Sequence, residues 1–210
     1  MESKSPVEKK ILETALKMFN DAGIEYVGMR ELAAALDMRI GNLTYYFPTK
    51  DDIVNRISLE LAEENNATIV IPESLTMATF FEMLEQVFRN HLKYRCLMLS
   101  FVHLIERNPL IAKRYSKTQL QRNNTWKKNI DALIEARYLS ATPDEIDFLI
   151  SSISLIARFW ISEAVISYKY LSEEEQIRHY LNMTARIFLP YATKKGRLKL
   201  EERISGRNDS

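Results

Sequence analysis

The stretch from Met29 to Asp52 constrains the fold more than any other part of the sequence. Apolar residues at positions 29, 32, 33 and 36 follow the i, i+3, i+4, i+7 spacing of one helix face. Asp37 then stands where the chain must turn, and Asp tolerates a left-handed backbone better than most residues. A second short helix follows, so the stretch is predicted to form a helix-turn-helix.

The second of these helices has a polar outward side. We expect Ile40, Leu43 and Phe47 to point inward. The residues left on the outer side or its edges are Arg39, Asn42, Thr44, Tyr45 and Tyr46. Groups of these kinds hydrogen-bond phosphates and base edges. Thr49 and Asp52 have the spacing of a capping box, which predicts the start of another helix.

A resemblance to the tetracycline-repressor (TetR) family is carried by residues 36–50, LDMRIGNLTYYFPTK. The family pattern is roughly L-G-V-S-x-G-T-L-Y-x-H/Y-F-x-S/T-K, and Leu43, Tyr46, Phe47 and Lys50 fall in register with it. The match covers about the first fifty residues, and the remaining chain resembles the family only in length and helical content. It implies an all-α fold with an N-terminal DNA-binding unit and a larger helical body for ligand binding and dimerisation.

Four residues depart from the family pattern. Asp37 replaces the usual turn Gly, and Thr44 replaces a Tyr. Arg39 replaces a Ser, so the second helix lacks a conventional N-cap but gains a long cationic donor. Gly28 replaces a common Thr, which removes a hydroxyl that could bind phosphate.

The resemblance also implies a function, a homodimeric transcriptional regulator and most simply a repressor. Its partners would be a palindromic double-stranded DNA operator and an unknown small-molecule effector that releases it. The residues expected to contact base edges are Arg39, Asn42, Thr44 and Tyr45. Tyr46 and Lys50 are expected to hold phosphates.

Three domains are predicted. Residues 1–50 form the helix-turn-helix domain, in which a first helix runs from about Ser5 to Ala22. The predicted core of this domain consists of Phe19, Leu32, Leu36, Leu43 and Phe47. Residues 51–191 form the ligand-binding and dimerisation domain, entered through a helix from Lys50 to about Ala67. Residues 192–210 form a charged tail, expected to be poorly ordered near its end.

The sequence between 146 and 166 is predicted to be a helix that is apolar on two sides. One stripe of side chains is formed by Ile146, Leu149, Ile153, Ala157, Trp160 and Ala164, and the other by Phe148, Leu155, Phe159 and Ile166. Such a helix must be buried on both sides, so we expect the same helix of a second copy to cover one of them. Three charged residues, Asp147, Arg158 and Glu163, argue against a membrane span.

Composition limits the function classes. The chain has 210 residues with a single cysteine, Cys96, which fits a reducing compartment and a cytoplasmic location. Residues 1–50 contain seven Lys/Arg and seven Asp/Glu, so this segment is neutral. A DNA-binding domain usually has a basic surface. The neutral charge therefore supports an alternative, a helical ligand-binding or scaffold protein that has lost specific DNA reading.

Candidate sites outside the helix-turn-helix are weaker. No residue spacing suggests catalysis, a metal site or a cofactor, so we predict no enzyme activity. Residues that could line an effector pocket are His103, Trp126, Arg158, Phe159 and Glu163. From Arg107 to Ile130 the chain has seven basic residues and no acidic one. This stretch is a solvated face, an anionic ligand entrance or a surface facing the DNA backbone.

Overall fold

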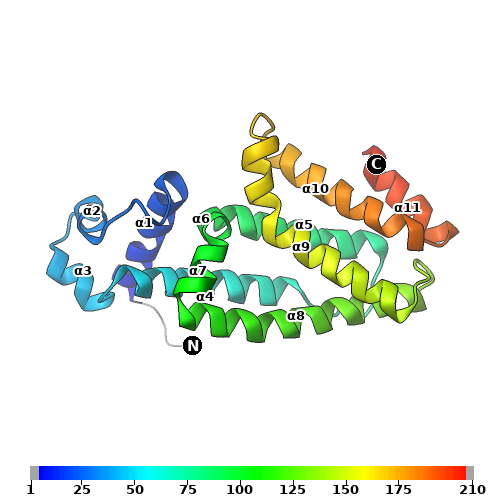
Figure 1. Ribbon diagram of the computed structural model, residues 1–210, viewed down its shortest axis with the longest axis horizontal. Coiled ribbons are helices and arrows are strands. Elements are labelled where there is room, and N and C mark those ends of the chain that lie inside the picture. Colours follow the sequence, from blue (N-terminus) through cyan, green and yellow to red (C-terminus); the bar gives the residue numbers. More distant parts are fainter. Residues whose placement is uncertain (1–4, 207–210) are drawn as a thin grey trace. The chain divides into compact units, whose positions relative to one another are not determined.

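The computed structural model describes residues 5–206, which form eleven α-helices and one short 3-10 helix (Figure 1). The N-terminal helices are α1 (Pro6–Ala22), α2 (Met29–Ala35), α3 (Ile40–Tyr46) and α4 (Lys50–Thr68). They are followed by α5 (Met77–Lys93), α6 (Arg95–Leu99), α7 (Phe101–Arg107) and α8 (Pro109–Glu135). The last are α9 (Pro143–Ser167), α10 (Glu173–Phe188), the 3-10 helix η1 (Leu189–Tyr191) and α11 (Lys194–Ser205). The predicted all-α fold is confirmed.

The chain divides into two compact units. The first takes in residues up to 63 together with 93–116, and the second takes in 64–92 and the chain from 117 onward. The first unit is larger than the predicted domain 1–50, because Tyr94, Leu97 and Ile111 pack into its core. The chain passes between the units within α4 and α8 and at the end of α5.

The first unit has the predicted core. Phe19, Leu32, Leu36, Leu43 and Phe47 are all buried. The helix before them begins and ends as its sequence indicates: the Ser5 Oγ accepts a hydrogen bond from the Glu8 amide at 3.1 Å, and Gly23 ends α1 with a φ of 95°. The prediction for Ile40 is wrong, since its side chain is 41% exposed. Ile40 is the first residue of α3 and lies at the edge of the helix contact.

Helix α4 begins with the predicted capping box. The Thr49 amide donates to Asp52 Oδ2 at 2.9 Å, and the Asp52 amide donates to Thr49 Oγ1 at 3.2 Å. The helix ends at Thr68, close to the predicted Ala67. Helix α5 begins at Met77, and the buried side chains of Leu75 and Met77 anchor its start in the core.

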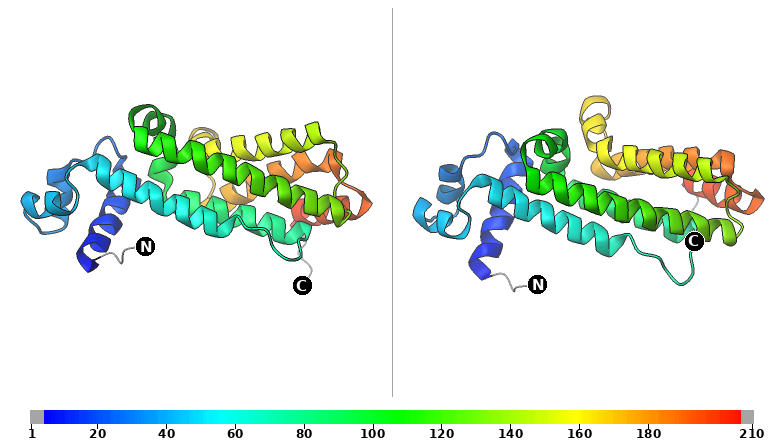
Figure 2. Two further views of the ribbon diagram at one scale, coloured as in Figure 1. Left: turned by 90° about the horizontal axis from the view of Figure 1, so that it is seen from below. Right: turned by 60° about the horizontal axis from the view of Figure 1, so that its bottom comes forward.

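Helices α9 and α10 pack side by side in the second unit (Figures 1 and 2). Each begins with a capping box. Thr142 and Glu145 form the box of α9, and Ser172 and Glu175 form that of α10. Of the two stripes predicted for α9, the first faces the core of the unit and contains the fully buried Trp160.

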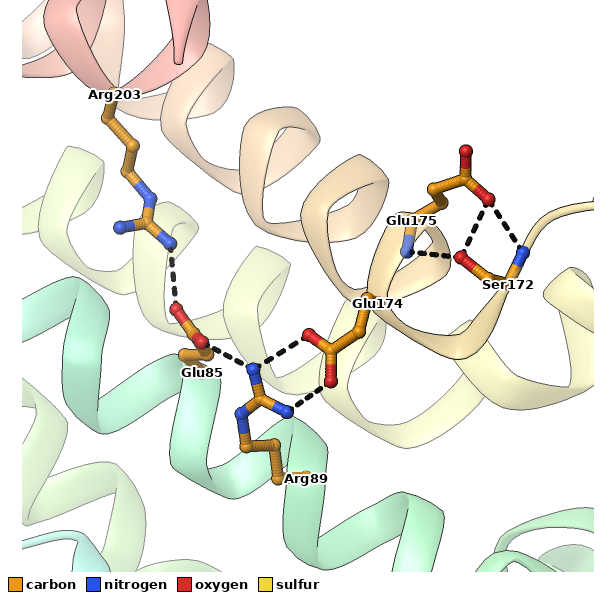
Figure 3. A network of polar contacts seen from close by, with 6 residues as sticks. All are labelled: Glu85, Arg89, Ser172, Glu174, Glu175 and Arg203. Carbon is orange, nitrogen blue, oxygen red and sulfur yellow. Dashed lines mark hydrogen bonds and ion pairs between the residues drawn. The ribbon is translucent and has the colours of Figure 1, made fainter. Parts of the chain in front are cut away.

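A network of charged side chains joins α5, α10 and α11 (Figure 3). The guanidinium of Arg89 donates to both carboxylate oxygens of Glu174, at 2.6 and 2.8 Å, and to Glu85 at 2.9 Å. These bonds raise the pKa of Arg89 and lower that of Glu174. Glu85 also pairs with Arg203 at 3.5 Å. The bidentate geometry fixes α10 against α5 more firmly than a single surface ion pair would.

Residues 194–205 of the predicted charged tail form α11. Its Leu200 is fully buried, and its Arg203 lies over the Phe81 ring at 5.0 Å. Gly196 lets the helix approach the chain closely, since a Cβ there would lie 1.9 Å from the Tyr138 carbonyl oxygen. The sequence did not predict this docking, because charged residues surround the few apolar residues of α11. The last positions of the tail, 207–210, lie outside the described residues.

Helix α9 is long and apolar enough to cross a membrane by length and composition alone, with a mean hydropathy of 1.6. It is the only such helix in the part of the chain that the structure describes. Only 33% of its most apolar window is buried. One such helix is weak evidence for a membrane span, because the core helix of a globular protein passes the same test.

Candidate nucleic-acid interface

The turn between α2 and α3 has the geometry that Asp37 was expected to provide. Asp37 adopts a left-handed backbone with a φ of 54°. The amides of Asp37 and Met38 donate to the carbonyls of Ala34 and Ala33 at 3.1 and 3.0 Å. These bonds close the end of α2 and fix the direction in which α3 leaves the turn.

Helix α3 presents polar residues on one side and is anchored on the other. Leu43 and Phe47 are buried in the core of the first unit. On the opposite side Arg39 and Asn42 are exposed, and Tyr45 is 82% exposed. No side chain of the described residues caps this helix, which matches the replacement of the usual Ser by Arg39. An anchored helix of this kind can enter a groove as a rigid body.

Thr44 and Tyr46 lie at the edges of this surface. The Thr44 hydroxyl donates to the carbonyl of Ile40 at 3.1 Å or of Gly41 at 3.2 Å, so it is left as an acceptor. Tyr46 is half-buried and packs edge to face against Tyr45, with ring centroids 5.3 Å apart. The pair stiffens both rings at the end of α3.

Lys50 has a structural role that the sequence did not reveal. Its ammonium donates to the carbonyl of Ile24 at 2.8 Å and to that of Glu25 at 3.4 Å. These bonds tie the start of α4 to the loop after α1. An ammonium has three N–H donors, so a phosphate contact requires the third.

Two exposed residues near this surface were not predicted. Tyr26 lies in the loop between α1 and α2 and is 81% exposed. Arg30 lies in the first turn of α2 and is also exposed. The backbone amide of Gly28 between them is occupied, because it donates to the Glu31 carboxylate at 2.8 Å. Sequence periodicity identifies buried faces, and these two residues carry no such signal.

Further hydrogen bonds inside the first unit hold α1 and α4 in place. The Asn20 side chain donates to the Lys93 carbonyl at 2.9 Å and accepts from the Cys96 amide at 3.0 Å. Arg114 at the start of α8 donates to Asn55 Oδ1 at 2.9 Å and to the Ser58 hydroxyl, both on α4. Arg114, one of the seven basic residues between 107 and 130, therefore holds the start of α8 against α4.

The five predicted pocket residues are divided between the two units. His103 is exposed and belongs to the first unit, and the other four belong to the second. Trp126 is buried against Phe80, with ring centroids 5.5 Å apart. The Glu163 carboxylate accepts a hydrogen bond from the Tyr180 hydroxyl. The guanidinium of Arg158 lies 5.9 Å from the ring centre of Phe159, the fifth residue of the set.

Burial explains the behaviour of Cys96. Its thiol is buried, and loss of solvation raises its pKa to about 12. The thiolate is therefore not populated near neutral pH, and Cys96 acts as a small apolar residue. Within residues 5–206 no group of three or more His, Cys, Asp or Glu is placed to hold a metal ion.

The chain matches two family models that together span nearly its whole length. Residues 11–57 match the model described as bacterial regulatory proteins, tetR family. Residues 60–200 match the TetR model described as bacterial transcriptional repressor. The junction between the two models falls within α4, the helix that leaves the first unit.

Relatives and solved structures agree with these matches. The chain is 29% identical over 87 residues to a probable HTH-type transcriptional regulator, YttP, of Bacillus subtilis, which is 40% of this chain and 42% of that protein. A TetR-family transcriptional regulator from Marinobacter aquaeolei has a TM-score of 0.88 at 23% identity, covering 95% of this chain and 98% of that one. A putative transcriptional regulator from Saccharomonospora viridis, solved in complex with choline, has a TM-score of 0.70 at 18% identity over 87% and 97%.

Proposed function

Because the chain belongs to the TetR family of transcriptional regulators, we propose that it is a dimeric, sequence-specific repressor released from a palindromic operator by a small-molecule ligand. It acts in the cytoplasm, spans no membrane and catalyses no reaction. The observation that carries the proposal is the surface of α3, where buried Leu43 and Phe47 hold an exposed polar side outward.

In this proposal the exposed side of α3 enters the major groove and reads bases. Arg39 suits the two acceptors of a guanine, and Asn42 suits the acceptor and donor of an adenine. Thr44 accepts rather than donates, because its hydroxyl is bonded within the helix. The exposed ring of Tyr45 can pack against a thymine methyl group.

The phosphate contacts come from the rim of this surface. Tyr46 and Lys50 retain the role proposed for them, with Lys50 using its third N–H. The exposed side chains of Tyr26 and Arg30 add donors from the loop after α1 and from α2. Such contacts fix orientation on the duplex and make affinity depend on salt concentration.

The dimer is supported by the outward stripe of α9. Phe148, Leu155 and Ile166 are 52, 59 and 78% exposed in the single chain. Met183 on the neighbouring α10 is also exposed. Monomeric proteins rarely expose a continuous apolar strip of this kind. A second copy that contributes the same two helices buries it, and the two-fold symmetry of that dimer matches a palindromic site.

The ligand is proposed to act through α4. This helix begins directly after α3 and continues into the second unit. A ligand that binds one position of α4 better than another shifts the population of DNA-binding dimers. The choline found in the relative from Saccharomonospora viridis belongs to that protein. It supports small-molecule binding by this fold without identifying the ligand here.

The alternative scaffold function predicts no salt-dependent DNA affinity. Selection from a random pool of DNA duplexes at moderate salt distinguishes the two. The repressor proposal predicts a palindrome whose half-sites lie about one helical turn or a multiple apart. Recovery of no sequence above background from the ligand-free protein would contradict it and favour the scaffold.

A further inference from the structure

A groove of about 290 Å³ lies between the end of α4, the connector that follows it and the first half of α5. Its apolar wall is formed by Val70 and Pro72 of the connector and by Met83 of α5. All the described residues that line it belong to the second unit. Sites for small molecules are concave and mostly apolar with a few polar groups, and this volume is at the lower end of their range.

The connector wall of the groove is held in place by α8 and by the core. The side-chain amide of Asn129 on α8 donates to the Val70 carbonyl at 3.0 Å, and Asn129 is fully buried. Ile69, the neighbour of Val70, is also buried, whereas Val70 itself is 45% exposed. The groove therefore exists before a ligand arrives, and binding does not require the connector to become ordered.

Hydrogen bonds determine which polar atoms of the wall remain free. Thr68 and Gln86 both line the groove. The Thr68 hydroxyl donates to the Glu64 carbonyl at 2.9 Å, so it must accept from Asn90 Nδ2, which lies 3.2 Å away. The Asn90 oxygen then accepts from Gln86 Nε2 at 2.9 Å. Thr68 is left with one lone pair, and Gln86 keeps its Oε1 and one N–H.

Of the described residues that line the groove, Glu82 alone is charged. Its carboxylate is exposed and has no ion-pair partner within residues 5–206. Glu82 and Gln86 are four residues apart on α5, so their side chains are neighbours on one face of the helix. The hydroxyl of Thr79, which also lines the groove, is bonded to Thr76. The groove therefore offers acceptors and a negative charge beside an apolar wall.

We propose that this groove binds the effector, and that the effector is a small apolar molecule with a protonated primary or secondary amine. Its apolar part packs against Val70, Pro72 and Met83, and its amine donates to Glu82 and to Gln86 Oε1. An ammonium group has donors and no acceptor, and its charge complements that of a carboxylate. An anionic ligand of the same shape would meet Glu82 with a like charge. This inference rests on the proposed ligand response and names the chemical class of the ligand.

The hydrogen bonds behind the groove connect it to α4. Asn90, which Gln86 and Thr68 contact, donates to Asn65 Oδ1 at 3.0 Å. Asn65 and Asn90 are both buried, and Thr68 is the last residue of α4. A ligand that contacts Gln86 and Thr68 therefore favours one arrangement of the end of α4, the helix through which the ligand is proposed to act.

The test uses three probes that share a phenethyl group: phenethylamine, its trimethylammonium analogue and hydrocinnamate. The full chain is isotope-labelled at the methyl groups of its 8 methionines for NMR. Met83→Leu and Met38→Leu assign two of the signals, and Met38 in the first unit is the internal control. We expect phenethylamine at millimolar concentration to shift the Met83 signal and to leave that of Met38 in place. The other two probes should shift the Met83 signal less.

Variants of Glu82 test the charge that selects the ligand. Glu82→Gln keeps the size of the side chain, and because Glu82 is exposed it should fold as the wild type does. We expect it to bind phenethylamine about three- to tenfold more weakly. Glu82→Lys should prefer hydrocinnamate to the amine. The matched control is Glu106→Gln, which changes an exposed Glu on α7 and should bind as the wild type does.

The proposal is overturned if phenethylamine leaves the Met83 signal unchanged, or if either of the other probes shifts it as strongly. It is also overturned if Glu82→Gln binds like Glu106→Gln, or if Glu82→Lys still prefers the amine. None of these results depends on DNA. Operator selection with the ligand-free protein therefore separates failure of this inference from failure of the repressor proposal.

Discussion

Helices α3 and α9 expose opposite kinds of side chains. In the first unit, α3 buries Leu43 and shows Arg39, Asn42 and Tyr45 to solvent. In the second unit, α9 buries Trp160 and still shows Leu155 and a row of other apolar residues. The first surface suits a charged, hydrogen-bonding partner, and the second suits an apolar one. One chain therefore carries two unlike exposed surfaces, for which we propose DNA and a second copy as the partners.

The largest expected effect on stability comes from removing a buried leucine of α3, and it is compared with the removal of an exposed leucine of α9. Leu43→Ala should lower the free energy of unfolding by about 2–5 kcal/mol, because it leaves a cavity in a complete core. The matched Leu155→Ala removes the same atoms from an exposed position and should change the unfolding of the single chain by less than about 0.5 kcal/mol. Chemical denaturation at low protein concentration measures both. Equal effects would show that the two leucines are not in different environments.

Arg39→Ala tests the polar side of α3. It should weaken specific DNA binding by roughly 1–3 kcal/mol and leave the unfolding free energy unchanged, since the side chain is exposed. Fluorescence anisotropy with a selected duplex measures the loss. Arg197→Ala, which removes an exposed arginine on α11, is the control. An unchanged affinity in Arg39→Ala would remove this residue from the interface.

The buried His91 of the second unit predicts that stability depends on pH. Since the folded pKa of His91 is lowered to about 3, the unfolded chain binds its proton first as pH falls. Stability is therefore lost from about pH 6.5 downward, by about 2 kcal/mol near pH 5. Urea unfolding of the wild type and of His91→Gln, at about pH 6.5 and at about pH 5, measures the loss of stability. An equal loss in both proteins would show that groups other than His91 cause it.

A smaller effect is expected where α3 passes into α4. Thr49→Ala removes the hydroxyl that accepts from the Asp52 amide and should lower stability by about 1 kcal/mol. Thr49→Ser keeps the hydroxyl and should behave as the wild type. A calorimetric melt compares the three proteins, and loss of stability in the Ser variant would contradict the capping role.

The sequence was most informative where periodicity and capping act locally. The five core residues of the first unit, the turn at Asp37 and the three capping boxes all follow from neighbours a few positions apart. The double stripe of α9 was also readable, because its residues repeat at helical spacing.

Contacts between distant residues were not readable. Lys50 resembles a phosphate-binding residue in sequence, and only the fold shows that it donates to the carbonyl of Ile24. The docking of α11 depends on the close approach of Gly196 to Tyr138, which are far apart in the chain. The contacts of the predicted pocket residues, such as that of Glu163 with Tyr180, were not readable either, because helix periodicity gives the face of a residue but not its neighbours on other helices.

The most direct test of the two-interface account is the number of chains bound per duplex, measured by analytical ultracentrifugation with a selected palindrome. We predict two chains for the wild type. Leu155→Glu should be a folded monomer whose affinity falls at least about a hundredfold, because the two recognition helices are no longer linked. A wild-type monomer on the duplex, or full affinity in Leu155→Glu, would contradict the account.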